Sequence, residues 1–181
     1  CAIASISFLS NLEIAIGRVR SNAAPETDGS SVLSGMRFLC AEDNALNDEI
    51  LEAILEMYGA SCTTRPDGAE LVKAFEMVKP GEYDAILMDI QMPHMNGYEA
   101  MKAIRGGRNP LGKAIPIIAM TANAFSDDIQ NSIAAGMDAY ISKPIDVAIL
   151  EKTIEGFLPP PESTACGRTF VRSIHKRITS P

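Results

Sequence analysis

The sequence lacks several features that mark common classes of protein. No apolar stretch reaches the roughly 20 residues needed to cross a bilayer, and the N-terminus has no basic start of the signal-peptide kind. Basic residues are in deficit, with 16 Lys and Arg against 23 Asp and Glu and a net charge of −7. That balance argues against a general nucleic-acid binder. We therefore expect a cytoplasmic module in which this segment contacts neither nucleic acid nor membrane.

Cysteine is also scarce. The four cysteines show no CxxC or other spacing typical of metal ligands. Two of them, Cys40 and Cys62, fall inside apolar runs, where a reduced cysteine packs as a small hydrophobic side chain. We interpret them as core thiols, and this interpretation places the protein in a reducing compartment.

The chain does contain a regular alternation of short apolar runs and amphipathic segments, repeated five times between Gly35 and Leu158. The runs predict strands at Met36–Ala41, Ala60–Thr64, Ala85–Met88, Ile115–Met120 and Ala139–Ile141. The segments predict helices over Asn44–Tyr58, from the Asp67 turn to about Val78, over Asn96–Arg105, over Ser126–Ala135 and from Asp146 to about Phe157. Five strand–helix units of this length favour a parallel sheet with helices on both faces.

The flanks differ from this central region in composition. Residues 1–34 combine a stretch with helically spaced apolar residues and a polar linker, and residues 159–181 form a basic tail without sustained periodicity. We predict a domain over 35–158. We interpret 1–34 as a flank or linker that belongs to an adjacent domain or is extraneous to the protein, and 159–181 as a disordered or extraneous tail.

Chemically reactive side chains stand just past four of the predicted strands. Glu42 and Asp43 follow the first, Asp89 the third, Thr121 the fourth and Lys143 the fifth. In an open α/β sheet these strand ends converge on one crevice. Each residue alone has an ordinary explanation: acids suit a helix start, an aspartate suits a turn and most lysines are exposed. Their joint occurrence after successive strands favours a site.

These elements resemble the receiver domain of two-component response regulators. The resemblance is carried by Glu42-Asp43, by Asp89 in Met-Asp-Ile-Gln-Met-Pro, by Thr121-Ala122 and by Lys143-Pro144. Neighbouring phrases such as Glu42-Asp43-Asn44-Ala45 look most like the receivers of hybrid sensor histidine kinases. The resemblance implies a flavodoxin-like, doubly wound, five-stranded parallel sheet in the order 2-1-3-4-5, with five helices in a three-layer αβα arrangement.

The resemblance also implies a role for each site residue. Asp89 would be the nucleophile that accepts a phosphoryl group from a kinase histidine. Mg²⁺, with Mn²⁺ able to substitute, would be bound by Asp43 and Asp89, by Glu42 through a water, and by the backbone carbonyl of Gln91. Lys143, ahead of a proline that is a candidate for a cis bond, would hold a phosphoryl oxygen.

Two further pairs follow from the same resemblance. Thr121 and Tyr140 would form a switch, with the hydroxyl moving toward the phosphoryl group and the ring turning inward. Tyr140 also has an ordinary explanation as a half-buried strand aromatic. Gln91 and Asn123, two residues past Asp89 and Thr121, occupy positions that influence hydrolysis.

The resulting hypothesis is a phosphoacceptor switch whose partners are a histidine kinase or a histidine phosphotransfer domain. It is no stand-alone enzyme beyond self-phosphorylation and self-dephosphorylation, although the parent protein could be a hybrid kinase. A homodimer through the fourth and fifth units stays open. A flavin carrier would need a Ser/Thr-rich loop where Glu42-Asp43 stands, and an aspartyl phosphatase would need a second aspartate at Gln91. A phosphorylation-independent interaction scaffold on the same fold remains the alternative.

Overall fold

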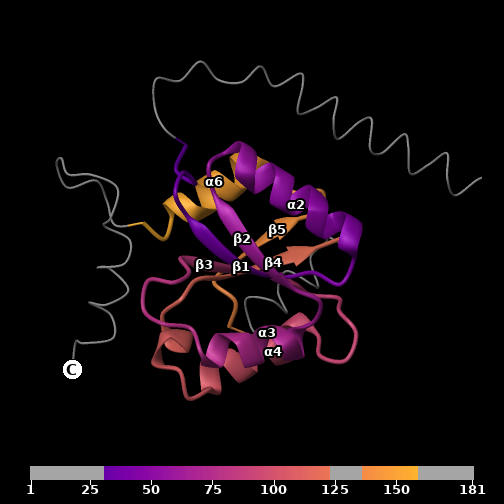
Figure 1. Ribbon diagram of the computed structural model, residues 1–181, viewed down its shortest axis with the longest axis vertical. Coiled ribbons are helices and arrows are strands. Elements are labelled where there is room, and N and C mark those ends of the chain that lie inside the picture. Colours follow the sequence, from indigo (N-terminus) through magenta and orange to yellow (C-terminus); the bar gives the residue numbers. More distant parts are fainter. Residues whose placement is uncertain (1–30, 123–135, 159–181) are drawn as a thin grey trace, which may run out of the picture. The chain divides into compact units, whose positions relative to one another are not determined.

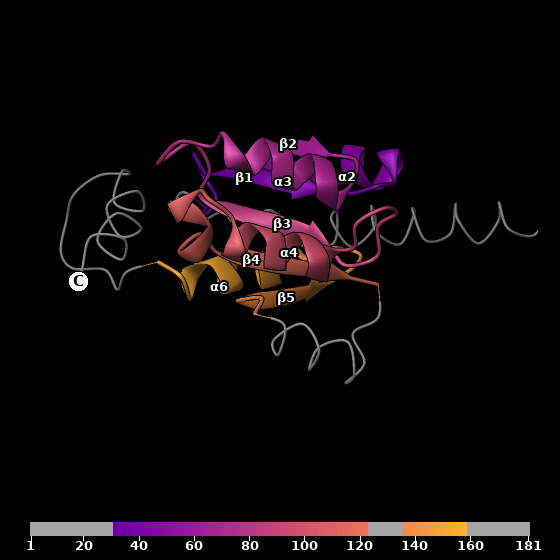
Figure 2. The same cartoon turned by 90° about the horizontal axis from the view of Figure 1, so that it is seen from below.

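Five parallel strands form one sheet in the order β2-β1-β3-β4-β5 (Figures 1 and 2). The computed structural model describes residues 31–122 and 136–158. The strands are β1 (Arg37–Ala41), β2 (Ser61–Arg65), β3 (Ala85–Asp89), β4 (Ile117–Thr121) and β5 (Ala139–Ser142). From β1 the chain adds β2 on one side and then β3, β4 and β5 on the other side. This is the doubly wound topology that the sequence predicted.

Helices connect the strands and begin at polar caps. They are α2 (Ala45–Met57), α3 (Gly68–Glu76), α4 (Gly97–Gly106), the short 3₁₀ helix η1 (Pro110–Lys113) and α6 (Val147–Glu155). Each α-helix begins after an Asn or Asp side chain that accepts hydrogen bonds from first-turn amides: Asn44, Asp67, Asn96 and Asp146. Such a cap contributes about 1 kcal/mol. The predicted helix over Ser126–Ala135 lies outside the described residues.

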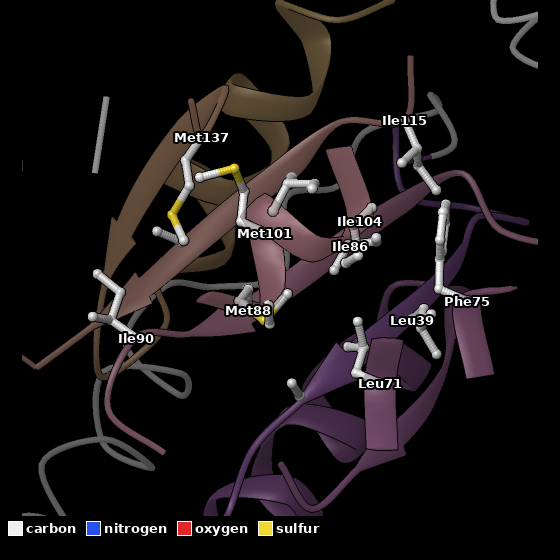
Figure 3. Packing of buried hydrophobic residues seen from close by; sticks show 14 of the residues in the cluster. Leu39, Leu71, Phe75, Ile86, Met88, Ile90, Met101, Ile104, Ile115 and Met137 are labelled. Atoms are coloured by element: carbon white, nitrogen blue, oxygen red, sulfur yellow. The ribbon is translucent and has the colours of Figure 1, made fainter. Parts of the chain in front are cut away.

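The helices cover both faces of the sheet (Figure 1). On one face, α3 and α4 pack on the sheet through large apolar side chains that include Leu39, Leu71, Phe75, Ile86, Met101 and Ile104 (Figure 3). On the other face, α2 and α6 pack on a second cluster that includes Phe38, Leu51, Leu55, Leu87, Leu150 and Ile154. Because β3 and β4 are buried along their whole length, they are apolar at every position except the last, which is Asp89 in β3 and Thr121 in β4.

The strand boundaries differ slightly from the predicted ones. Asp89 and Thr121 are the last residues of β3 and β4, where the prediction placed them just beyond. The fourth strand starts at Ile117 because Pro116 has no amide hydrogen to give to the ladder. The functional side chains are therefore fixed by sheet hydrogen bonds at their own positions.

The chain ahead of the first strand also packs on the domain. Leu33 is fully buried in the cluster beneath α2 and α6. The Ser31 hydroxyl donates a 2.5 Å hydrogen bond to Oε1 of Glu151 on α6. These contacts lie before Gly35, where the sequence predicted the domain to begin.

Within residues 31–122 and 136–158, no helix has the length and apolar character required to cross a membrane.

Candidate functional site

The strand ends bring four of the predicted residues to one edge of the sheet. Because the strands are parallel and in register, Ala41 pairs with Met88, Asp89 with Met120, and Thr121 with Ser142. Glu42 directly follows β1, and Lys143 directly follows β5. Residues far apart in the sequence are thus placed next to one another by backbone pairing.

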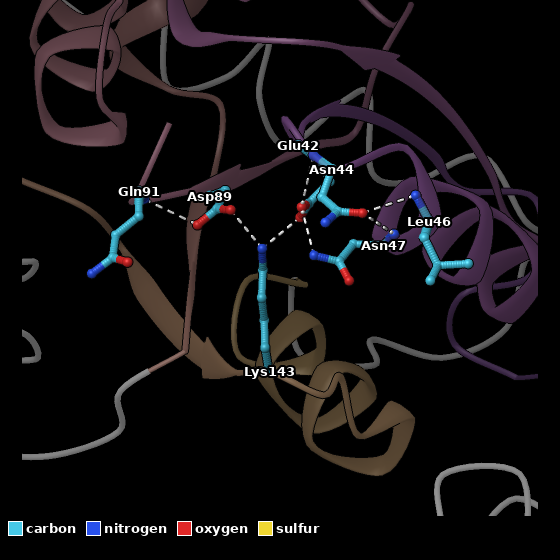
Figure 4. A network of polar contacts seen from close by, with 7 residues as sticks. All are labelled: Glu42, Asn44, Leu46, Asn47, Asp89, Gln91 and Lys143. Carbon is cyan, nitrogen blue, oxygen red and sulfur yellow. Dashed lines mark hydrogen bonds and ion pairs between the residues drawn. The ribbon is translucent and has the colours of Figure 1, made fainter. Parts of the chain in front are cut away.

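Lys143 connects the two buried acids at the centre of this edge (Figure 4). Its ammonium nitrogen lies 2.5 Å from Oε2 of Glu42 and 2.5 Å from Oδ2 of Asp89. Burial alone would lower the pKa of Lys143, but hydrogen bonds to Asp89 and Glu42 and the charges of both acids outweigh burial, so its pKa is raised above 10.5. The lysine is therefore cationic at neutral pH.

Three carboxylates form a compact acidic cluster. Glu42, Asp43 and Asp89 each offer an oxygen, and these oxygens all lie within 4.8 Å of one another. Glu42 and Asp89 are 4% and 6% exposed, whereas Asp43 faces solvent. Oxygen donors at this spacing, open to water on one side, fit a hard divalent cation that keeps part of its hydration shell.

The backbone around Asp89 is tightly held. Oδ1 of Asp89 accepts a 3.1 Å hydrogen bond from the amide of Gln91. Gly97, the first residue of α4, packs directly over this turn: a Cβ there would collide with the Asp89 carbonyl oxygen and lie 3.0 Å from the Ile90 Cα. The sequence predicted only that a helix begins near Asn96, and the need for glycine at position 97 is visible only in the packing.

The two predicted switch residues occupy different environments. Thr121 is buried at the end of β4, while the Tyr140 side chain on β5 is 38% exposed. Tyr140 pairs in register with Ala119, two residues before Thr121. Asn123 lies outside the described residues. The peptide bond between Lys143 and Pro144 is cis.

Sequence reasoning missed two contacts near the site. The Asn47 amide donates a 2.9 Å hydrogen bond to Oε1 of Glu42. His94, which follows the third strand, has a positive φ of 63° and lies with Nδ1 3.6 Å from Oδ2 of Asp67. Asn47 could have been found from its position in the first turn of a helix that begins just after Glu42.

Comparison with known proteins identifies the family. The model of the response regulator receiver domain matches residues 38–155. The chain belongs to this family. A receiver is the phosphoacceptor module of a two-component phosphorelay, and this chain contains that module. The family match covers Glu42, Asp43, Asp89, Thr121 and Lys143, and all of the sheet except the first residue of β1.

The curated relatives are histidine kinases much longer than this chain. Histidine kinase 1 of Arabidopsis thaliana is 35% identical over 173 residues, which cover 79% of this chain and 14% of the relative. Hybrid signal transduction histidine kinase I of Dictyostelium discoideum is 35% identical over 146 residues, covering 80% of this chain and 8% of the relative. The receiver thus spans a small part of each relative that it matches.

Solved structures include close matches to the receiver fold. The receiver domain of sensor histidine kinase PA1611 from Pseudomonas aeruginosa, crystallised with a magnesium ion in the active-site cleft, has a TM-score of 0.60 and 39% identity, covering 68% of this chain and 98% of that one. The receiver of Saccharomyces cerevisiae Ssk1, in complex with the phosphotransfer protein Ypd1, has a TM-score of 0.58 and 29% identity, covering 67% of this chain and 88% of that one.

Proposed function

We propose that Asp89 of this receiver accepts a phosphoryl group from a phosphohistidine and passes it to the histidine of a phosphotransfer domain or loses it to water. The observation that carries this proposal is the convergence of the Lys143 ammonium with the three carboxylates around Asp89. Phosphoryl transfer depends mainly on alignment and charge neutralisation. The cluster supplies acidic groups for a cation and a second positive charge from the protein itself.

The reaction assigns a separate task to each side chain. A carboxylate oxygen of Asp89 forms a bond to phosphorus as the bond from phosphorus to the donor's imidazole nitrogen breaks, and that nitrogen leaves with the bonding electron pair. Lys143 already touches Asp89, so it can hold a phosphoryl oxygen after a small change of its own contacts. The buried Thr121 hydroxyl is the donor for a second oxygen.

Mg²⁺ is the cation proposed for the acidic cluster, with Mn²⁺ as a substitute. Asp43 and Asp89 would bind it directly, Glu42 through water and Gln91 through its backbone carbonyl. When bound, the ion neutralises negative charge on the phosphoryl oxygens. The support is the chemistry of the donor set, three carboxylates whose oxygens lie within 4.8 Å, together with the magnesium ion in the related PA1611 receiver.

A mass measurement tests the phosphoacceptor. Incubation with acetyl phosphate and Mg²⁺ should add the mass of one phosphoryl group to the chain, and Asp89→Asn should abolish the gain. Asp43→Asn should require more Mg²⁺ for the same rate. No gain in the wild-type chain, or an undiminished gain in Asp89→Asn, would refute the proposal and leave the interaction scaffold as the function of this fold.

The proposed switch joins Thr121 to Tyr140. Movement of the Thr121 hydroxyl toward the phosphoryl group would open space, and the partly exposed Tyr140 ring would turn into it. A Tyr140→Ala variant should take phosphate at the wild-type rate but lose the phosphorylation-dependent change in partner affinity. Normal signalling by that variant would remove Tyr140 from the mechanism. Gln91 and Asn123 are proposed to set the rate of hydrolysis.

The partner class is a histidine kinase or a histidine phosphotransfer domain, in line with the Ssk1 receiver bound to Ypd1. We assign the receiver to residues 35–158, residues 1–34 to a flank or linker whose last residues pack on the receiver through Ser31 and Leu33, and residues 159–181 to a basic tail. We place the protein in the cytoplasm. A homodimer would form through the fourth and fifth strand–helix units, and sedimentation of the phosphorylated chain tests it.

A further inference from the structure

Glu42 is a buried acid whose two oxygens have different partners. Oε2 contacts the Lys143 ammonium, and Oε1 accepts hydrogen bonds from the Asn47 side chain at 2.9 Å and from the Asn44 amide at 3.4 Å. A buried carboxylate is costly unless its oxygens are paired. The short 2.9 Å bond makes the Asn47 amide the main donor to Oε1.

Asn47 is held in place by the helix and not by its own side chain. Its backbone amide donates to the Asn44 side chain, which caps α2, and its side-chain amide points back toward Glu42 (Figure 4). The two asparagines therefore have separate roles. Asn44 caps the helix, and the contact of the Asn47 amide with Glu42 contributes nothing to the cap.

The chemistry of the donor matters for the acidic cluster. An amide is neutral, so it fixes the orientation of the Glu42 carboxylate without neutralising its charge. A cationic donor at Oε1 would weaken the attraction of the cluster for a divalent ion. With Oε1 occupied on the helix side, Oε2 is left facing Lys143 and the oxygens of Asp89.

We propose that Asn47 is a positioning residue that sets the affinity of the site for Mg²⁺ by orienting Glu42. This inference rests on the proposed function, because it assigns Glu42 to the shell of the cation. Partners of ligand groups in metal sites typically change metal affinity 10–100-fold when removed. Without the Asn47 amide, Glu42 is free to turn both oxygens toward Lys143. The Lys143 ammonium then competes with Mg²⁺ for the negative charge of the Glu42 carboxylate.

Calorimetric titration of Mg²⁺ into the full chain tests the inference without phosphate. Asn47→Ala should weaken Mg²⁺ binding about 10-fold. Glu42→Ala should also weaken it, and the double variant should bind no more weakly than Glu42→Ala alone, since Asn47 acts through Glu42. Asn47→Gln, which keeps an amide donor, should recover part of the affinity.

Asp67→Ala is the matched structural control. Asp67 caps α3 at the same edge of the sheet with a 2.8 Å bond from the Glu70 amide, so its loss should lower stability and leave the Mg²⁺ affinity unchanged. In the acetyl phosphate reaction, Asn47→Ala should raise the Mg²⁺ concentration for half-maximal rate and keep the rate at saturating Mg²⁺.

Two results would overturn the inference. One is wild-type Mg²⁺ affinity in Asn47→Ala; the other is a double variant in which the two losses add in full. The proposed function is tested separately by the mass measurement. It fails if the wild-type chain gains no phosphoryl group on Asp89. That outcome can occur while the calorimetric series still shows coupling between Asn47 and Glu42.

Discussion

The Lys143 ammonium lies 2.5 Å from Oδ2 of Asp89, although 54 positions of sequence separate the two residues. β3 and β5 are not neighbours, because β4 lies between them. The contact therefore depends on the register of two strand pairs and on a side chain long enough to reach across β4. A slip of either pair would separate the cation from the acid.

Removal of this cation should destabilise the domain. In Lys143→Met, Glu42 and Asp89 stay buried beside each other without a positive charge between them. We expect a loss of about 3 kcal/mol in the free energy of unfolding without divalent ions, the lower end for a broken buried pair because the Lys143 side chain is 19% exposed. Urea denaturation measures the loss, and phosphorylation by acetyl phosphate should slow in parallel.

Lys102→Met is the control for loss of a lysine as such. Lys102 is exposed on α4, away from the acidic cluster, and its replacement should change the free energy of unfolding by less than about 0.5 kcal/mol. Mg²⁺ should also stabilise Lys143→Met more than the wild-type chain, because the ion then supplies the only positive charge in the cluster. Equal stability of the two variants would contradict the role of Lys143.

Gly97 should tolerate no side chain. In Gly97→Ala the new methyl group collides with the Asp89 carbonyl, so either α4 or the end of β3 must shift. We expect a loss of about 1–3 kcal/mol in the free energy of unfolding and slower phosphorylation of Asp89.

Gly106→Ala at the other end of α4 is the matched control. Nothing lies within 4 Å of its Cβ position, and we expect the free energy of unfolding to rise by up to about 1 kcal/mol. Thermal and urea unfolding of both variants compare them, and equal effects would contradict the packing argument.

Asp84 should make the domain more stable in mild acid than at neutral pH. Burial raises the pKa of its carboxyl above 3.8, and this outweighs the hydrogen bond from the Arg37 amide and the Arg37 charge. The folded state then holds the proton more tightly than the unfolded chain, so this group's contribution to stability falls as pH rises from about 3.8 through the raised pKa. At pH 7 the ionised form is a net cost.

Asp84→Asn should remove this cost. An amide oxygen at position 84 can still accept the 2.8 Å hydrogen bond from the Arg37 amide. We expect the variant to be at least as stable as the wild-type chain at pH 7 and to lack its loss of stability above pH 3.8. Urea denaturation across this range measures both. A variant clearly less stable at pH 7 would indicate that the Arg37–Asp84 ion pair outweighs burial.

The two core thiols should differ in reactivity. Cys40 is fully buried and its pKa is raised by burial, whereas a hydrogen bond from Cys40 lowers the pKa of the half-buried Cys62. The thiolate is the reactive form. Iodoacetamide should therefore modify Cys62 in the folded chain and Cys40 only after unfolding, as read by peptide mass mapping. Equal labelling of both in the folded chain would contradict this difference.

Much of the fold could be predicted because its signals are local. The buried runs Ile86–Met88 and Ile117–Met120 are apolar at every position, and the helices start at capping residues such as Asp67 and Asp146. Asp89 and Lys143 could be singled out because charged groups directly after strands need a partner. The parallel topology then places those partners at one edge of the sheet.

The remaining features depend on three-dimensional packing that a one-dimensional pattern does not contain. The Asn47–Glu42 bond needs the angle at which α2 leaves β1, and the contact of Gly97 with Asp89 needs the seating of α4 on β3. Asp67 and His94 meet because two loops lie side by side, 3.6 Å apart at the closest polar atoms. None of these contacts follows from periodicity, since each joins residues from separate elements.

The buried Leu33 side chain anchors the short segment just ahead of β1 to the domain. A truncated protein starting at Gly35 would lose this anchor and leave a hole under two helices. The Ser31–Glu151 hydrogen bond joins the same segment to α6, and the burial of Leu33 joins it to the core. The folded unit therefore includes residues 31–34 as well as the strands and helices of the receiver.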